Sequence, residues 1–190
     1  MKSLKTIVIL SIVVSGCVSD PVARPNGFMR IGMPEKTYSP IQMEGCPFSS
    51  SLNSSAKILY KDSANCWIDI VYPTLLSTIQ LTYKPVENNL QELFMDAQKL
   101  AYKHTVKATG MREQVFAYDS SRVYGMYYEM SGASATTTQF YATDSAKHFL
   151  RGVLYHYSTP NPDSLAPVTS FMREEMLEFI SNLYWTGEQS

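Results

Sequence analysis

The stretch 66-CWIDIVYPTLLSTIQLTYK-84 decides the fold of this chain, because apolar and polar side chains alternate along both of its halves. The residues that share one face in each half are Cys66, Ile68, Ile70 and Tyr72, and then Ile79, Leu81 and Tyr83. A period of two is typical of a half-buried β-strand. Pro73 and Thr74 interrupt the pattern, where a turn is needed. The stretch therefore predicts two antiparallel strands that form a hairpin with one face on a hydrophobic core.

Further strands are predicted on both sides of this hairpin. Residues 56–61 form a short candidate strand and residues 28–33 another, while the rest of 28–55 is rich in Pro, Ser and Gly and is expected to be irregular. The alternation returns four times further on, in residues 112–118, 123–130, 136–143 and 148–157. Short connections favour an antiparallel meander, since parallel pairs need long crossovers. Gly125 and Gly152 fall inside these strands, where glycine often marks a close approach of another group.

Two segments carry apolar residues at helical spacing instead. The first begins at Leu90 and is expected to span about five turns. The second begins near Asp163 or Ser164, with Pro167 in its first turn. Both helices must bury an apolar stripe against the sheet. We therefore predict an α+β fold, an antiparallel meander sheet packed by two amphipathic helices, and this order resembles the PsbP/Mog1-type sandwich at the level of topology.

The first residues have the layout of a bacterial lipoprotein signal. Lys2 and Lys5 precede an apolar core, and the small residues Ser15 and Gly16 lead directly into Cys17. The core is far shorter than the roughly 20 apolar residues of a membrane-spanning helix. An ordinary secretory peptide cut nearby and a short buried strand are the alternatives, and neither accounts for the cysteine. The expected organisation is a signal peptide at residues 1–16, a lipidated Cys17 with a tether over residues 17–27, and a single domain at residues 28–190.

The charge composition argues against nucleic acid as a partner. Loss of Lys2 and Lys5 takes the 16 basic residues to 14 against 17 acidic ones, so the mature chain has a net charge near −3. The sequence has no run of Lys and Arg, and nucleic-acid binding is therefore not expected. The thirteen tyrosines suit half-buried sheet faces and protein interfaces alike.

Two cysteines remain once Cys17 carries lipid. Outside the cytoplasm the compartment is oxidising, so Cys46 and Cys66 are expected to form a disulfide, with two buried free thiols as the alternative. The two cysteines are far apart and have no histidine nearby, which does not fit the ligand spacing of a zinc site. No metal or cofactor is expected.

Motifs for catalysis are missing from the sequence. It has no Gly-rich phosphate loop, no His-Glu-x-x-His and no Gly-x-Ser-x-Gly. His148 and His156 would lie roughly 26 Å apart on one strand and cannot share a metal, so a structural role is expected for each. Ser145 and His148 could be drawn as a nucleophile and its base, but their segment has the composition of a turn. The chain is therefore not expected to be an enzyme.

Several segments together resemble one known family. They are residues 28–31 (FMRI), 46–48 (CPF), 66–68 (CWI), 81–90 (LTYKPVENNL), 100–105 (LAYKHT), 139–145 (QFYATDS), 147–152 (KHFLRG) and 163–168 (DSLAPV). In this order, over nearly the whole mature chain, they are similar to the gliding motility lipoprotein GldD family of Bacteroidetes. The resemblance implies an envelope lipoprotein that acts, without catalysis or cofactor, as an assembly or stabilising component of the gliding and type IX secretion machinery.

The same resemblance suggests an interaction surface with other envelope proteins. Its candidate residues, which could equally be determinants of the fold, are Lys103, His104, Asp144, Lys147, His148 and Arg151. Residues 18–20 (VSD) lack the Lys-plus-acids pattern of surface-exported lipoproteins, so the anchored domain is expected to face the periplasm. The alternative function is a lipid-anchored periplasmic module that binds a small or glycan ligand through its Tyr-rich sheet.

Overall fold

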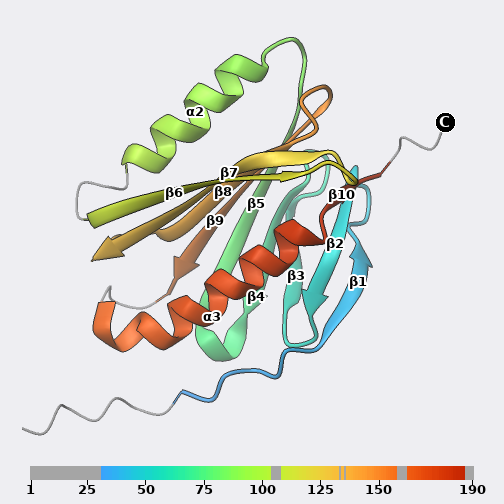
Figure 1. The fold of residues 1–190 in the computed structure, drawn as a ribbon. Coiled ribbons are helices and arrows are strands. Elements are labelled where there is room, and N and C mark those ends of the chain that lie inside the picture. The colour runs from blue at the N-terminus through green and yellow to red at the C-terminus, as the bar shows by residue number, and fades with distance from the viewer. Residues whose placement is uncertain (1–30, 104–107, 133, 135, 158–161, 187–190) are drawn as a thin grey trace, which may run out of the picture. The chain divides into compact units, whose positions relative to one another are not determined.

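A computed structural model of the chain describes residues 31–103, 108–132, 134, 136–157 and 162–186. The predicted signal peptide, Cys17, the tether and His104 lie outside the described residues. The described part consists of antiparallel strands and two α-helices (Figure 1). The predicted α+β class is therefore confirmed.

The elements follow the alternation and periodicity of the sequence closely. In chain order they are β1 (Tyr38–Gln42), β2 (Phe48–Asn53), β3 (Lys57–Asp62), β4 (Trp67–Tyr72), the 3-10 turn η1 (Pro73–Leu75), β5 (Ser77–Pro85), α2 (Leu90–Lys103), β6 (Ala108–Tyr118), β7 (Val123–Gly132), β8 (Thr136–Thr143), β9 (His148–His156), α3 (Pro162–Ser181) and β10 (Tyr184–Trp185). The predicted hairpin is β4, η1 and β5, in which Ile70 stands opposite Ile79.

A seven-stranded sheet in the order β3-β4-β5-β9-β8-β7-β6 forms the centre of the fold. The strands β6 to β9 pair antiparallel in sequence, so the predicted meander is confirmed. The last of them, β9, pairs antiparallel with β5 along its whole length, and Thr82 stands opposite Arg151. This pairing joins the first hairpin and the meander into one sheet.

Residues 34–55 are not irregular as predicted, because they contain β1 and β2, whereas the described part of the candidate strand 28–33, residues 31–33, is not a strand. These two strands and β10 form a separate three-stranded antiparallel sheet. The sequence FSSSLN of β2 does not show the apolar alternation of a strand, because its buried residues Ser49 and Ser50 are small and polar. The Ser50 hydroxyl donates a hydrogen bond of 2.7 Å to the carbonyl of Phe179 in α3. Small side chains on β2 therefore allow the helix to lie close against it.

The predicted disulfide between Cys46 and Cys66 is present, with 5.6 Å between the two Cα atoms. Cys46 precedes β2 and Cys66 precedes β4, so the bond links the small sheet to the large one. The alternative of two free thiols is thereby excluded for this structure.

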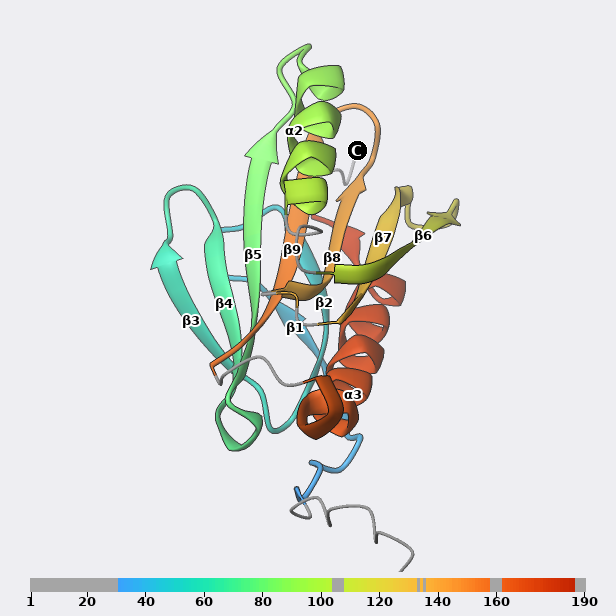
Figure 2. The same ribbon diagram turned by 90° about the vertical axis from the view of Figure 1, so that its left-hand side faces the viewer.

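The two helices lie on opposite faces of the large sheet (Figures 1 and 2). On one face, α3 packs between both sheets and buries Met172, Met176 and Phe179 in the larger core. On the other face, α2 buries only Leu93, Ala97 and Ala101. These residues belong to two smaller clusters, one of Leu93 and Ala97 with Phe149 and one of Ala101 with Tyr128 and Met130.

Helix bounds differ slightly from the prediction. Helix α2 has 14 residues, which is about four turns rather than five. Helix α3 begins at Pro162, so Pro167 lies in its second turn and not in its first. Pro162 suits the first helical position, because its fixed φ is already helical and the missing N–H has no intrahelical partner there.

Gly152 makes room for an aromatic ring of the neighbouring strand rather than for a helix. A Cβ atom at Gly152 would lie 2.1 Å from the ring of Phe140, which stands directly opposite on β8. The Phe140 ring in turn packs on Phe179 of α3, with 6.1 Å between the ring centroids. The close approach predicted at this glycine is thus confirmed, and it lets the sheet hold a large ring against α3.

Candidate interaction surface

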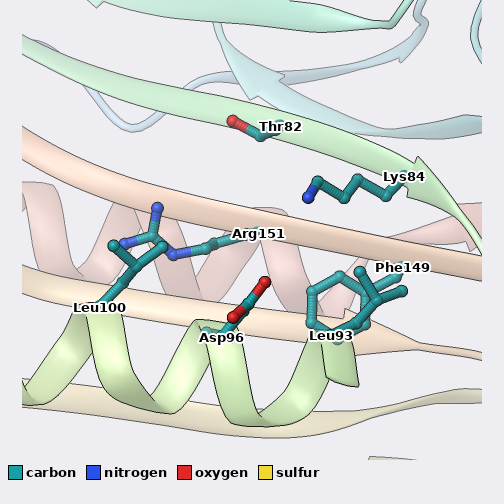
Figure 3. A pocket seen from close by; sticks show the side chains of 8 residues that line it. Thr82, Lys84, Leu93, Asp96, Leu100, Phe149 and Arg151 are labelled. Carbon is teal, nitrogen blue, oxygen red and sulfur yellow. The ribbon is translucent and has the colours of Figure 1, made fainter. Parts of the chain in front are cut away.

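The residues predicted for one interaction surface fall in separate places. Lys103 is exposed at the end of α2, and His104 lies outside the described residues. Asp144 and His148 are buried at the turn between β8 and β9. Arg151 is three residues further along β9, and because side chains alternate along a strand it points to the opposite face from His148, towards α2 (Figure 3).

Asp144 organises the turn between β8 and β9. Its Oδ1 atom accepts hydrogen bonds from the backbone N–H groups of Ala146, Lys147 and His148, at 3.0, 2.8 and 2.8 Å. Burial opposes ionisation of this carboxyl group, but the three N–H groups together outweigh it and hold the pKa of Asp144 below its ordinary value. Asp144 is therefore a determinant of the turn, while Lys147 is exposed at its tip.

His148 closes the same end of the molecule. Its ring stacks on Trp185 of β10, with 5.0 Å between centroids and 14° between the planes. The Tyr83 hydroxyl lies 2.8 Å from its Nδ1 atom, and the Trp185 Nε1–H donates to the carbonyl of Arg122 at 3.1 Å. Burial lowers the pKa of His148, so the neutral imidazole is favoured. These contacts fasten β10 to the large sheet, which is a structural role.

His156, at the other end of β9, also has a structural role. Its Nδ1 atom lies 2.8 Å from the Ser77 hydroxyl of β5, and its Nε2 atom lies 3.1 Å from the Thr169 hydroxyl of α3. Burial lowers the pKa of His156, and the nearby charge of Arg173 lowers it further. Both histidines thus make hydrogen bonds within the fold, as expected of structural residues.

A buried carboxylate that the sequence analysis did not single out connects α3 to both sheets. Glu175 accepts hydrogen bonds from the hydroxyls of Tyr38 and Tyr72, both at 2.8 Å, and from Asn53 Nδ2 at 3.3 Å. Burial, together with the Glu175 carboxylate, raises the pKa of both tyrosines. The sequence does not show that Glu175 is buried, because it lies next to the exposed Glu174 in a charged run of the helix.

A cleft lies between α2 and the large sheet and has a volume of about 100 Å³. Its walls come from three elements: Thr82 and Lys84 of β5, Phe149 and Arg151 of β9, and Leu93, Asp96, Ala97 and Leu100 of α2. Figure 3 shows that the charged side chains of Lys84, Asp96 and Arg151 all reach into the space between helix and strands. The apolar side chains of Leu93 and Phe149 close one end.

Neither cation at this cleft forms a salt bridge with a described residue, although the Asp96 carboxylate lines the same cleft. The Arg151 Nη2 atom donates to the neutral amide oxygen of Gln139 at 2.6 Å. No carboxylate of a described residue lies within salt-bridge distance of Arg151 or Lys84. Lys84 and Asp96 were missed in the sequence, although Thr82 and Lys84 continue the polar face of the β4–β5 hairpin. No local pattern in the sequence shows that β9 places Arg151 beside Thr82 and Lys84.

In the described ranges, no group of three or more His, Cys, Asp or Glu side chains could hold a metal ion. Within the same ranges, neither helix is long and apolar enough to span a membrane.

Comparison with known proteins shows a family and a structural likeness. Residues 18–185 match the family described as "Gliding motility lipoprotein GldD". No curated protein matches the sequence. Among solved structures, the chain is similar to cyanobacterial PsbP (CyanoP) from Synechocystis sp. PCC 6803, with 8% sequence identity and a TM-score of 0.48, over 85% of this chain and 99% of that one.

Proposed function

We propose a function from one premise: the chain belongs to the gliding motility lipoprotein GldD family. It is accordingly a lipoprotein associated with gliding motility. Our proposal is that it serves as a non-enzymatic assembly or stabilising component of the gliding machinery and of the type IX secretion system linked to it. The observation that carries the proposal is the family match, which spans residues 18–185 and so includes every element of the described fold.

The placement of the polar groups supports an assembly role. The buried side chains that could act as acids or bases make contacts within the fold. Asp144 bonds to its turn, His148 contacts Tyr83 and Trp185, and Glu175 bonds to Tyr72. Catalytic acids and bases need a cleft in which a substrate can meet them. The charged groups that do reach a cleft are Lys84, Arg151 and Asp96, and none of them pairs there with a second group of the described residues as the acid and base of a catalytic site would.

The proposed anchor is the lipid on Cys17. More than one acyl chain is needed for stable anchoring, and a diacylated or triacylated cysteine supplies them. Residues 17–27 then form the tether, and residues 18–20 (VSD) favour a domain that faces the periplasm. The lipid would hold the domain beside envelope proteins of the same machinery.

The structure supports assembly better than the alternative of a small-ligand or glycan binder. The cleft under α2 is well below the roughly 300–1,000 Å³ of common ligand pockets, and a second hollow, lined by residues of β1, β2 and β3, reaches only the lower end of that range at about 300 Å³. Several tyrosines that suggested a binding sheet are used for packing, since Tyr72 and Tyr127 are fully buried and Tyr141 stacks on Phe149. The sheet therefore does not present a tyrosine platform at these positions.

The test is a chromosomal Cys17→Ser variant in the native bacterium, compared with a deletion strain. We expect the variant to leave the membrane fraction and to lose gliding and type IX secretion, as the deletion does. Colony spreading, the amount of a secreted reporter and immunoblots of membrane and soluble fractions measure the three effects. Ser19→Ala is the matched control and should retain all three. A soluble Cys17→Ser protein that still supports gliding and secretion would refute the proposal.

A further inference from the structure

Helix α2 covers only part of its face of the large sheet. Beside it, on β3 and β4, the side chains of Leu59 and Trp67 are 50% and 46% exposed. Both residues point away from the larger core, because their neighbours Ile58 and Ile68 pack into that core. An aromatic and an aliphatic side chain thus lie open on the sheet next to α2.

This open area is continuous with the cleft under α2. Trp67 stands opposite Thr82, and Thr82 stands opposite Arg151. Two strand spacings therefore separate Trp67 from Arg151, which is roughly 10 Å. Leu100 of α2, 41% exposed, lines the same cleft as Arg151 (Figure 3). The docking strip is defined here as Leu59, Trp67, Thr82, Lys84, Arg151 and Leu100.

The charges of the strip indicate what it binds. Arg151 is half-buried, and a cation in this position without a counter-charge is unfavourable. Lys84 reaches into the same cleft from β5 (Figure 3). A carboxylate placed between these two cations would accept charge-assisted hydrogen bonds, which are stronger than those between neutral groups. Asp96 stands on the helix side of the cleft and repels an entering carboxylate, so the attraction of the two cations must exceed this repulsion.

We propose that the docking strip binds a segment of a partner protein that carries an Asp or Glu side chain flanked by apolar side chains. The carboxylate enters the cleft between Lys84 and Arg151, and the apolar side chains contact Leu59 and Trp67. Trp and Arg are the residue types that most often dominate the energy of protein interfaces. The size of the cleft suits a single side chain and excludes a larger ligand. This inference rests on the proposed assembly function and names the surface that performs it.

The experiment uses the full-length lipoprotein in its native bacterium, with the photoreactive residue benzoylphenylalanine in place of Leu59. Irradiation should give a protein adduct, and mass spectrometry should place the crosslink in a segment that contains Asp or Glu next to apolar residues. Combining Lys84→Gln with Arg151→Gln should reduce the adduct at least tenfold. Lys84→Gln alone should already weaken the adduct, and Lys36→Gln, which removes one positive charge on the α3 side of the molecule, should leave it unchanged. Asp96→Asn should increase it, because the repulsion is removed.

The strictest test reverses the charges on the two sides of the proposed contact. Lys84→Glu should abolish the adduct, and replacing the acidic residue of the crosslinked segment with Lys should restore it. Lys84 is exposed, so this variant tests the idea even if changes at the half-buried Arg151 lower protein levels. An adduct that all charge variants leave unchanged, an adduct with lipid alone, or no adduct at normal protein levels would overturn the docking strip. The assembly function would survive each of these results as long as the Cys17→Ser variant loses gliding and secretion.

Discussion

The two faces of the seven-stranded sheet are covered in different ways. On one face, α3 and the small sheet enclose a continuous core and are fastened by the Glu175 hydrogen bonds. On the other face, α2 buries one leucine and two alanines and leaves a cleft with Leu59 and Trp67 open beside it. Alanine removes much less apolar surface from water than Met or Phe does. The α3 face therefore carries most of the stability, while the α2 face can be used for recognition.

The largest expected effect is a cavity on the α3 face. Phe179→Ala removes a ring that is 1% exposed and packs on Phe140, and it should lower the free energy of unfolding by about 3–5 kcal/mol. The matched change on the other face is Leu93→Ala, for which about 2 kcal/mol is expected, because a surface near the cleft relaxes more easily. Urea titration followed by circular dichroism measures both. Equal losses would break the comparison between the two faces.

The disulfide should have the next largest effect. Replacing Cys46 and Cys66 with Ala opens a loop with a sequence separation of 20 residues, which should cost about 3 kcal/mol in the chain-entropy model. Reductant should lower the urea midpoint of the native protein towards that of the double variant. The double variant is its own control, since reductant should not affect it. Full alkylation of both cysteines in the folded native protein without reductant would contradict the bond.

The smallest expected effect is the pH dependence of stability. It tests the packing of α3 on the sheet, because His156 bonds to Thr169 of that helix. Burial lowers the pKa of His156 in the folded chain below the ordinary 6.5, so the folded state binds fewer protons than the unfolded one. Stability should therefore fall as pH drops below about 6.5 and stay level above it. Burial also lowers the pKa of His148, which acts in the same direction, whereas Asp144 titrates only below its ordinary 3.8 and does not contribute in this window. Urea midpoints between pH 5 and 8 measure the effect.

His156→Gln is the control for this pH dependence. Gln can bond to Ser77 and Thr169 but does not titrate, so the midpoint of this variant should depend less on pH than that of the native chain. A native midpoint that rises as pH falls from 7 to 5 would contradict the assigned direction.

Local patterns in the sequence predicted most of the central sheet and both helices. The alternation of Ile68 and Ile70 against Ile79 and Leu81 was enough for the hairpin, because one face of each strand is buried and the other is polar. The strands β1, β2 and β10 were missed for a physical reason. Buried serines in β2 make room for α3 without raising hydrophobicity, and β10 is only two residues long.

The candidate surface was predicted less well. Asp144 and His148 were chosen from their dense polar segment, and the structure uses them for a turn and for contact with Trp185. Arg151 was chosen from the same segment and does reach a cleft. Polar composition alone does not distinguish these cases, since it says nothing about which face of the sheet each side chain occupies relative to a helix.

The sequence by itself determined the types and order of the central elements, the pair of cysteines and the membership of a lipoprotein family, because these follow from local periodicity, spacing and matching segments. Only the tertiary structure decided that β9 pairs with β5 and that the two helices take opposite faces of the sheet. That pairing brings Thr82 and Lys84 beside Arg151, about seventy residues away in the sequence. The choice depends on long-range strand pairing and core packing, which no local pattern of side chains contains.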